Sequence, residues 1–138
     1  MKLRAATLDD AERLLEWRND PLTREASVNM DPVPLEAHVG WLTASLQNPN
    51  RTLLVAEVDG RPVGTVRIDR GHETEMSWTV APDARGRGFG KQMVSAAMPE
   101  GTVIAHIKAG NVASQKIAQS SGFTLTRDEA LQRWERLA

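Results

Sequence analysis

The stretch that decides the fold is Val80-Ala-Pro-Asp-Ala-Arg-Gly-Arg-Gly-Phe-Gly-Lys91. A strand-like run at 76–80 enters this stretch, and a helix-like run at 92–98 leaves it. Backbone amides at a glycine-rich turn that opens a helix bind anions, because unpaired N–H groups and the positive end of the helix point the same way. The stretch therefore predicts a site for a phosphate-bearing cofactor, and the alternative is a glycine-rich surface turn.

The spacing of the glycines excludes two nucleotide-binding motifs. Gly86, Gly88 and Gly90 alternate as G-x-G-x-G, whereas the dinucleotide fingerprint needs G-x-G-x-x-G. A Walker A loop has four residues between its glycines and a Ser or Thr after its lysine. Here three residues separate Gly86 from Gly90, and Gln92 follows Lys91. The remaining pattern is Arg85-x-x-Gly88-x-Gly90 after a strand.

Length and composition indicate one domain, 1–138, because 138 residues suit a single hydrophobic core. The absence of cysteine excludes disulfides, thiolate metal sites and a cysteine nucleophile, and we expect no metal site. Lys plus Arg is 17 against 18 for Asp plus Glu. The chain therefore has no excess of positive charge that would favour binding to nucleic acid or to an anionic membrane. Without a signal-peptide or membrane-length apolar run, a cytoplasmic location is expected.

The spacing of apolar residues and the positions of turn residues predict helices and strands across the whole chain. Helices are expected at about 8–18, from Pro34 to about 47, through 92–98, and after Asn111 up to Gly122. Leu35, Val39, Leu42 and Leu46 are expected to face the core. The segment 20–33 is expected to be a loop with at most one helical turn. Strands are expected at 2–6, 52–57, 62–68, 75–80, 102–107, 123–126 and 132–135, with Asp59-Gly60 as a hairpin turn. The order indicates a single α+β layer structure.

Two motifs together resemble the GNAT acetyltransferase superfamily. The first is the stretch from Val80 to Lys91. The second is Asn111-Val-Ala-Ser-Gln-Lys-Ile-Ala-Gln-Ser-Ser-Gly-Phe123, which is similar to the superfamily's "N-x-x-S…G-F" helix. The resemblance implies a single-domain α+β fold with a mixed, mostly antiparallel sheet that splays between its fourth and fifth strands. About four helices should flank this sheet.

The resemblance also implies that acetyl-CoA is the acetyl donor and assigns its contacts. The backbone of Trp78, Thr79 and Val80 should pair with the pantetheine amides, and an exposed N–H there should polarise the acetyl carbonyl. The pyrophosphate should lie on the loop formed by Arg85, Gly86, Arg87, Gly88, Phe89, Gly90 and Lys91. Asn111 should contact the pantetheine arm, although its residue type and position also fit a plain helix N-cap.

The implied reaction is direct attack of an amine on the thioester in a ternary complex. Many members of the superfamily protonate the leaving thiolate with a tyrosine, but here Ala118 occupies that position and the chain contains no tyrosine. Ser114, on the preceding turn, or a water is the expected acid. Glu75 is the expected base, acting through a water, because it shares a strand face with Ser77; a solvated carboxylate is the alternative.

The first third of the chain resembles amino-sugar acetyltransferases of the pseudaminic-acid pathway, through a "W-R-N" start and an "E-x-H-x-x-W" helix. The expected acceptor is a small-molecule amine, with a nucleotide-linked 4-amino sugar favoured. A similar "R-N" start occurs in ribosomal-protein N-terminal acetyltransferases, so protein acetylation stays open, as does a non-catalytic CoA-binding regulatory module. Either a monomer or a homodimer is compatible with the sequence. The expected substrate contacts are Arg18, Asn19, His38, Trp41 and Arg67.

Overall fold

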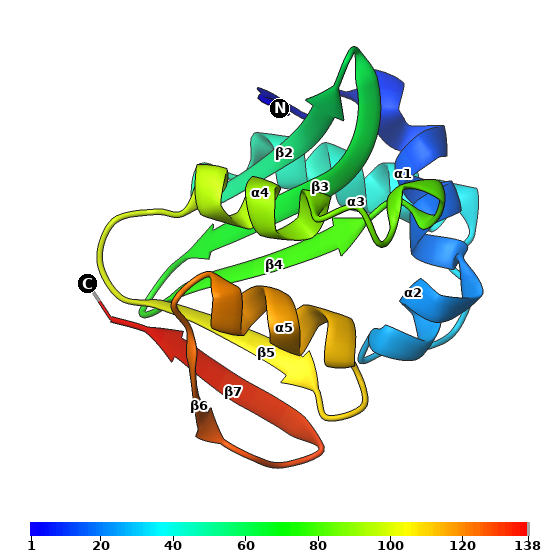
Figure 1. The fold of residues 1–138 in the computed structure, drawn as a ribbon. Coiled ribbons are helices and arrows are strands. Elements are labelled where there is room, and N and C mark those ends of the chain that lie inside the picture. The colour runs from blue at the N-terminus through cyan, green and yellow to red at the C-terminus, as the bar shows by residue number, and fades with distance from the viewer. Residues whose placement is uncertain (138) are drawn as a thin grey trace.

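A computed structural model describes residues 1–137 as one seven-stranded sheet with helices on both faces (Figure 1). The strand order in space is β1-β2-β3-β4-β5-β7-β6, and only β4 and β5 pair in parallel. The expected single-domain α+β fold with a mixed, mostly antiparallel sheet is therefore confirmed. The strands are β1 (Lys2–Ala5), β2 (Arg51–Val58), β3 (Arg61–Arg70), β4 (Thr74–Val80), β5 (Val103–Lys108), β6 (Thr124–Arg127) and β7 (Leu131–Arg136).

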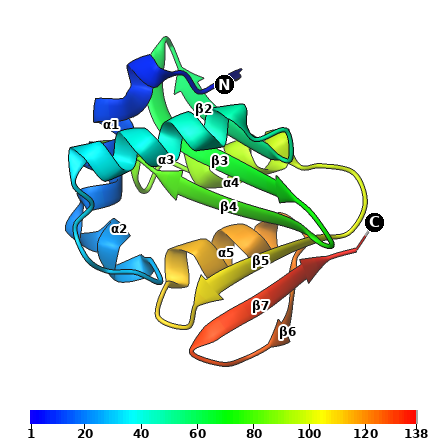
Figure 2. The ribbon, with the colours of Figure 1, turned by 180° about the vertical axis from the view of Figure 1, so that it is seen from behind.

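Five α-helices are present within the described residues, one more than expected. They are α1 (Ala11–Asn19), α2 (Pro21–Ala26), α3 (Leu35–Gln47), α4 (Phe89–Ala97) and α5 (Val112–Ser120). Helices α4 and α5 cover one face of the sheet in Figure 1, and α1 and α3 cover the other face in Figure 2. None of the helices within residues 1–137 has the length and apolar character needed to cross a membrane.

The additional helix is α2, which lies in the segment expected to be a loop. Asp20 ends α1 and also begins α2, where its Oδ2 accepts a hydrogen bond from the Thr23 amide at 3.2 Å. Pro21 occupies the first turn, where a missing N–H has no cost. The Asn-Asp-Pro sequence that stops one helix therefore restarts the next.

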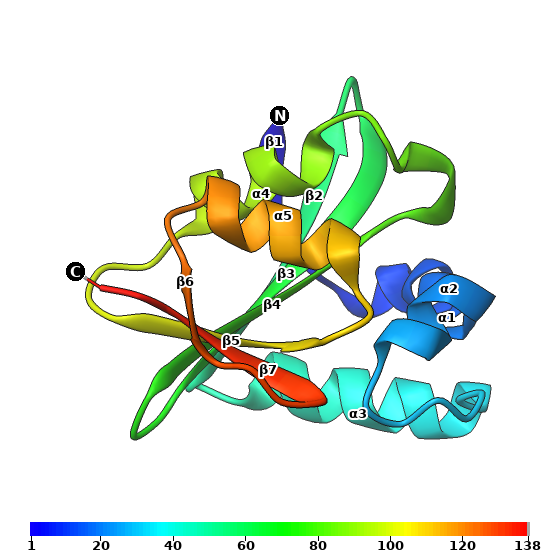
Figure 3. The same ribbon diagram turned by 60° about the horizontal axis from the view of Figure 1, so that its bottom comes forward.

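The sheet splits into two halves where β4 meets β5. Their parallel pairing is limited to Thr74 with Val103 and Glu75 with Ile104. The antiparallel pairing of β4 with β3 continues along its whole length to Val80. The two strands diverge beyond Glu75, as the view in Figure 3 shows, and the expected splay is confirmed.

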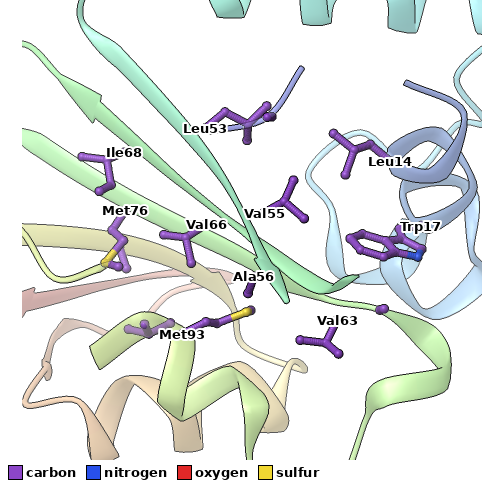
Figure 4. Packing of buried hydrophobic residues seen from close by; sticks show 14 of the residues in the cluster. Leu14, Trp17, Leu53, Val55, Ala56, Val63, Val66, Ile68, Met76 and Met93 are labelled. Carbon is purple, nitrogen blue, oxygen red and sulfur yellow. The ribbon is translucent and has the colours of Figure 1, made fainter. Parts of the chain in front are cut away.

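The hydrophobic core occupies both faces of the central strands. Val55 and Val66 are fully buried in β2 and β3. Leu14 and Trp17 approach the sheet from α1, and Met93 approaches its opposite face from α4 (Figure 4). Packing on both faces of one sheet holds the strands, while the loops at the ends of the strands remain available for a site.

Helix α3 is rotated relative to the expected orientation. Its buried residues are His38, Leu42 and Ser45, whereas Leu35, Val39 and Leu46 are exposed. The expectation for Leu42 is confirmed, but it was wrong for Leu35, Val39 and Leu46, because the stripe that packs inward joins Leu42 to two polar residues at helical spacing. The buried side includes His38, which the fold places beside α1.

Candidate active site

The glycine-rich loop forms an uncapped helix N-terminus. Gly88 is the N-cap of α4, with φ of 77°, and it offers no side chain to the first amides of the helix. Gly86 also has a positive φ, of 76°, and a Cβ at either glycine would meet nothing within 4 Å. Left-handed backbone and open space leave the amides of this loop exposed to an anion, so the loop fits a pyrophosphate.

The basic side chains of the loop lie in different surroundings. Arg87 and Lys91 are exposed, and neither takes part in an ion pair within residues 1–137. Arg85 instead turns towards α2, where its Nη2 donates to Asp20 Oδ2 at 2.7 Å and to Thr23 Oγ1 at 3.1 Å. This guanidinium also keeps the pKa of Asp20 below its usual value. The role of Arg85 as a phosphate ligand stays a prediction.

An open backbone edge runs from the splay towards the loop. The part of β4 that contains Trp78, Thr79 and Val80 pairs with β3 on one side and has no partner from β5 on the other. Unpaired strand edges accept an added extended chain through main-chain hydrogen bonds. The structure therefore leaves room for the pantetheine pairing expected at these three residues.

Beside this edge lies a cleft of about 460 Å³ between α1, α3 and the face of β3 and β4. Its floor contains the cross-strand pairs Thr65 with Thr79 and Arg67 with Ser77. A second hollow of about 540 Å³ lies away from the splay, beside β1 and the end of α3. The cleft is lined by Leu14, Trp17, Arg18, Ser27, Val33, His38, Trp41, Leu53, Thr65, Arg67, Ser77, Trp78 and Thr79.

The cleft brings together four of the five expected substrate contacts, which are Arg18, His38, Trp41 and Arg67. Two arginines line it and its lining within residues 1–137 contains no Asp or Glu, although Arg67 is ion-paired with Asp69 just outside the lining. The Trp41 ring lies 5.9 Å from the guanidinium of Arg67 and stacks on the His38 ring at 5.8 Å. An aromatic ring beside an arginine guanidinium is suited to a planar or anionic ligand.

Each of the two arginines is held by a hydrogen bond from its guanidinium to the protein. Arg18 Nη2 donates to the Asn29 carbonyl at 2.7 Å, while its Nη1 is buried without a partner. Arg67 Nε donates to Asp69 Oδ2 at 2.7 Å. Because each guanidinium carries further donors in a fixed plane, this fixation orients the remaining N–H groups without consuming them.

The remaining expected residues lie outside the lining of the cleft. Asn19 clamps the backbone of Val33, donating to its carbonyl at 2.9 Å and accepting from its amide at 2.8 Å. The Glu75 side chain is 41% exposed, and its Oε2 lies 3.2 Å from Nδ1 of His106. Asn111 caps α5, because its Oδ1 accepts from the Ser114 amide at 3.2 Å. The catalytic and binding roles of these residues stay predictions.

Sequence reasoning did not assign roles to several residues that shape the cleft. Thr65 shares a strand face with Arg67, and the alternation of side chains along β3 was a signal that could have identified it. Asp20 belongs to the segment that was expected to be a loop and was given no role, although it binds Arg85 of the glycine-rich loop. No local pattern indicates such a contact, because 65 positions separate the two residues.

A family model described as an acetyltransferase (GNAT) domain matches residues 1–124. The chain belongs to this family. The expected acetyl-CoA-dependent N-acetyltransferase is therefore confirmed at the level of the enzyme class, whereas the pseudaminic-acid subgroup is not confirmed. Among curated proteins, none matches this chain.

Solved structures share the GNAT fold over nearly the whole chain. A ribosomal-protein-alanine N-acetyltransferase from Brucella melitensis is 28% identical, with a TM-score of 0.82 and 100% of both chains covered. A putative acetyltransferase from Salmonella typhimurium with its cofactor acetyl-CoA is 23% identical, with a TM-score of 0.82 and coverage of 99% and 93%. Spermidine N-acetyltransferase from Vibrio cholerae with CoA and spermine is 14% identical, with a TM-score of 0.84 and coverage of 99% and 94%. Because the last two structures are less than 25% identical to this chain, their similarity shows a shared fold alone.

Proposed function

We propose that this GNAT protein transfers the acetyl group of acetyl-CoA to the primary amine of a small molecule that also carries an anionic group. A nucleotide-linked 4-amino sugar is the favoured acceptor. The observation that carries the proposal is the cleft beside the open edge of β4, which presents Arg18 and Arg67 and, within residues 1–137, no carboxylate. Guanidinium groups bind phosphate and carboxylate, whereas a polyamine would be repelled from this cleft.

Acetyl-CoA would lie where β4 and β5 diverge. The amides from Gly86 to Lys91 would hold its pyrophosphate, and the edge of β4 from Trp78 to Val80 would pair with its pantetheine arm. The reacting thioester would then lie beside the cleft, because Trp78 and Thr79 border both. A backbone N–H of this edge would stabilise the oxyanion, and Asn111 or Ser114 at the start of α5 would flank the arm.

The second candidate function is N-terminal protein acetylation. It is favoured by the 28% identity to a ribosomal-protein-alanine N-acetyltransferase over the whole chain. The two candidates differ in what occupies the cleft, because a peptide N-terminus brings an extended chain whereas a nucleotide sugar brings two phosphates and a ring. A CoA-binding regulatory module is the candidate of another class, and it predicts binding without transfer.

The experiment combines calorimetry with a substrate panel. Acetyl-CoA should bind, and undetectable binding at millimolar acetyl-CoA would contradict the proposal. The panel contains UDP-linked 4-amino sugars, the free amino sugars, peptides with an N-terminal alanine, and spermidine. Turnover of the nucleotide sugars with much weaker turnover of the free sugars supports the anionic contact. Turnover of peptides alone supports the second candidate, and binding without turnover of any amine supports the regulatory module.

A further inference from the structure

Within residues 1–137, the lining of the cleft offers no accessible group that could take up the proton of an attacking amine. Its titratable residues are Arg18, His38 and Arg67. Arginine stays protonated in proteins and cannot accept a proton. His38 is only 4% exposed, so little of its ring can meet a substrate. A general base for the acetyl transfer is therefore to be sought beside the cleft.

A histidine and a glutamate form a pair beside the cleft, where β4 and β5 separate. Nδ1 of His106 in β5 lies 3.2 Å from Oε2 of Glu75 in β4. Glu75 shares one face of β4 with Ser77 and Thr79, because side chains alternate along a strand. Both Ser77 and Thr79 line the cleft. The contact with Glu75 therefore puts the His106 ring on the same side of the sheet as the cleft.

The strand register places His106 across the gap from Ser77. Glu75 and Ile104 are the last paired residues of β4 and β5, and beyond them the strands diverge (Figure 3). Two residues further along the same parallel register, Ser77 and His106 come to opposite sides of the gap. The side chains of His106 and Glu75 are 33% and 41% exposed, so solvent can reach the pair. The pair flanks the gap in which the proposed thioester would lie.

We propose that His106 is the general base of the acetyl transfer, acting through one water, and that Glu75 positions its ring. This inference rests on the proposed function. The amine nitrogen attacks the acetyl carbonyl carbon, the C–N bond forms, and the C–S bond breaks with its electron pair leaving on the sulfur. The nitrogen gives one proton to the water as the water gives one to Nε2 of His106. The thiolate takes a proton from the Ser114 hydroxyl, which regains one from solvent, or directly from water. His106 returns its proton to solvent after the product leaves.

The Glu75 carboxylate determines which ring nitrogen of His106 can serve as the base. A carboxylate only accepts hydrogen bonds, so its contact with Nδ1 favours the neutral tautomer that carries its proton on Nδ1. The lone pair of the neutral ring is then on Nε2, which is the atom that gains a proton. Once the proton arrives, the carboxylate lies at ion-pair distance from an imidazolium and stabilises it.

The other charged groups near His106 are bound to partners of their own. On β7, Arg133 is the register partner of His106. Its guanidinium donates hydrogen bonds to Glu73 and Glu135. The pKa of Glu73 is lowered chiefly by this arginine, and the charge of His106 contributes to the same effect. On the same strand as His106, Lys108 donates to a backbone carbonyl of α2 at 2.9 Å. The two cations are thus held by other groups, and the nearby carboxylates favour the protonated ring.

Glu75, the base expected from the sequence, is less suited to this role than its partner. Histidine side chains titrate nearer to neutral pH than glutamate, which suits a base that gains and loses a proton in each cycle. Glu75 also lies where β4 still pairs with β5, whereas His106 lies in the part of β5 that has separated from β4. Variants of the two residues distinguish a base from the group that positions it.

The test compares wild-type protein with His106→Gln, Glu75→Gln and the control His72→Gln, which changes an exposed histidine in the turn before β4. The acceptor is the best amine from the substrate panel, and acetyl-CoA is saturating. The kinetic measurements are kcat and acceptor KM from about pH 5 to about pH 9, the range in which histidine titrates. Calorimetry measures acetyl-CoA binding, and circular dichroism checks the fold. Nitrogen NMR of the histidine rings in the wild-type protein identifies the tautomer of His106.

His106→Gln should lower kcat by about 100-fold or more, because a general base contributes roughly that factor. The acid limb of its kcat profile should disappear, and acetyl-CoA affinity should change by no more than about twofold. Glu75→Gln should keep the limb but move it to lower pH by up to about one unit, because the imidazolium loses its carboxylate. His72→Gln should behave as wild type, and NMR should place the proton of the neutral His106 ring on Nδ1. Added imidazole should partly restore the rate of His106→Ala, a result that a purely structural role would not produce.

Several results would overturn the role of His106. One is a His106→Gln enzyme with wild-type kcat and an intact acid limb, and another is a rise in acceptor KM alone. Loss of the limb in Glu75→Gln but not in His106→Gln assigns the base to Glu75. If His106→Gln does not fold, a wild-type kcat profile without an acid limb, or a neutral ring with its proton on Nε2, is decisive against the proposal. Absence of turnover by wild type on every amine overturns the proposed function itself, which separates the two failures.

Discussion

Arg85 of the glycine-rich loop forms an ion pair with Asp20, the residue at which α1 ends and α2 begins, with 2.7 Å between Nη2 and Oδ2. The pair joins the loop that would hold acetyl-CoA to the segment that leads into Ser27 and Val33 of the cleft wall. The proposed donor and acceptor sites are thus linked by a contact between residues distant in the sequence.

Replacing Asp20 by asparagine should change the KM for the acceptor amine more than the affinity for acetyl-CoA. The change removes a partly exposed ion pair, so we expect a stability loss of less than about 1 kcal/mol. Acceptor KM should rise several-fold because α2 loses its tie to the loop. The affinity for acetyl-CoA, measured by calorimetry, should stay equal or increase because Arg85 becomes free to reach phosphate. The control is Asp83→Asn, which removes the exposed pair with Arg61. Weaker acetyl-CoA binding with an unchanged acceptor KM would contradict this expectation.

Gly90→Ala should destabilise the protein through the contact between α4 and α5. A Cβ at position 90 would lie 2.4 Å from Ile117 Cδ1 and 3.2 Å from Val80 Cγ2. Overpacking of this kind costs about 1–3 kcal/mol, which chemical denaturation would show as a lower midpoint. The matched control is Gly40→Ala in α3, where a Cβ meets nothing within 4 Å. There we expect a gain of about 0.5–1 kcal/mol from helix propensity. Equal effects of the two variants would refute the packing argument.

Ser114→Ala tests the acid that protonates the thiolate. If the Ser114 hydroxyl is the donor, kcat should fall by about 100-fold when single-turnover kinetics show that chemistry limits the rate. The Asn111 cap uses the backbone amide of Ser114, so the helix start should survive the change. Ser120→Ala, at an exposed position of the same helix, is the control. An unchanged kcat in Ser114→Ala would leave water as the donor.

Stability should fall on mild acidification because of His38. Its pKa is lowered in the fold, so the unfolded chain binds the proton more readily below the ordinary value of 6.5. The free energy of unfolding should therefore decrease as the pH drops below about 6.5, by at most about 1.4 kcal/mol per pH unit. The difference between wild type and His38→Gln isolates this contribution, since His72 and His106 are present in both proteins. Parallel stability curves for the two proteins would rule out this linkage.

The sequence alone determined the fold class, the glycine-rich loop between β4 and α4, and most of the element order. The Val80–Lys91 stretch and the Asn111 helix carry local signals, because glycine spacing, caps and strand alternation depend on neighbours within a few residues. The Asp59-Gly60 hairpin followed in the same way and is confirmed by φ values of 53° and 77°. Four of the five residues expected to contact the substrate also line one cleft.

Only the tertiary structure decided which face of α3 packs inward, where Arg85 points and which histidine lines the cleft. Apolar periodicity favoured Leu35 and Val39, but packing in the fold buried His38 and Ser45 instead. The pairing of Arg85 with Asp20, and the burial of His38 Nε2 beside Arg18, join residues from separate elements. Such contacts depend on how helices dock on a splayed sheet, and this docking is set by packing among distant segments rather than by any local pattern.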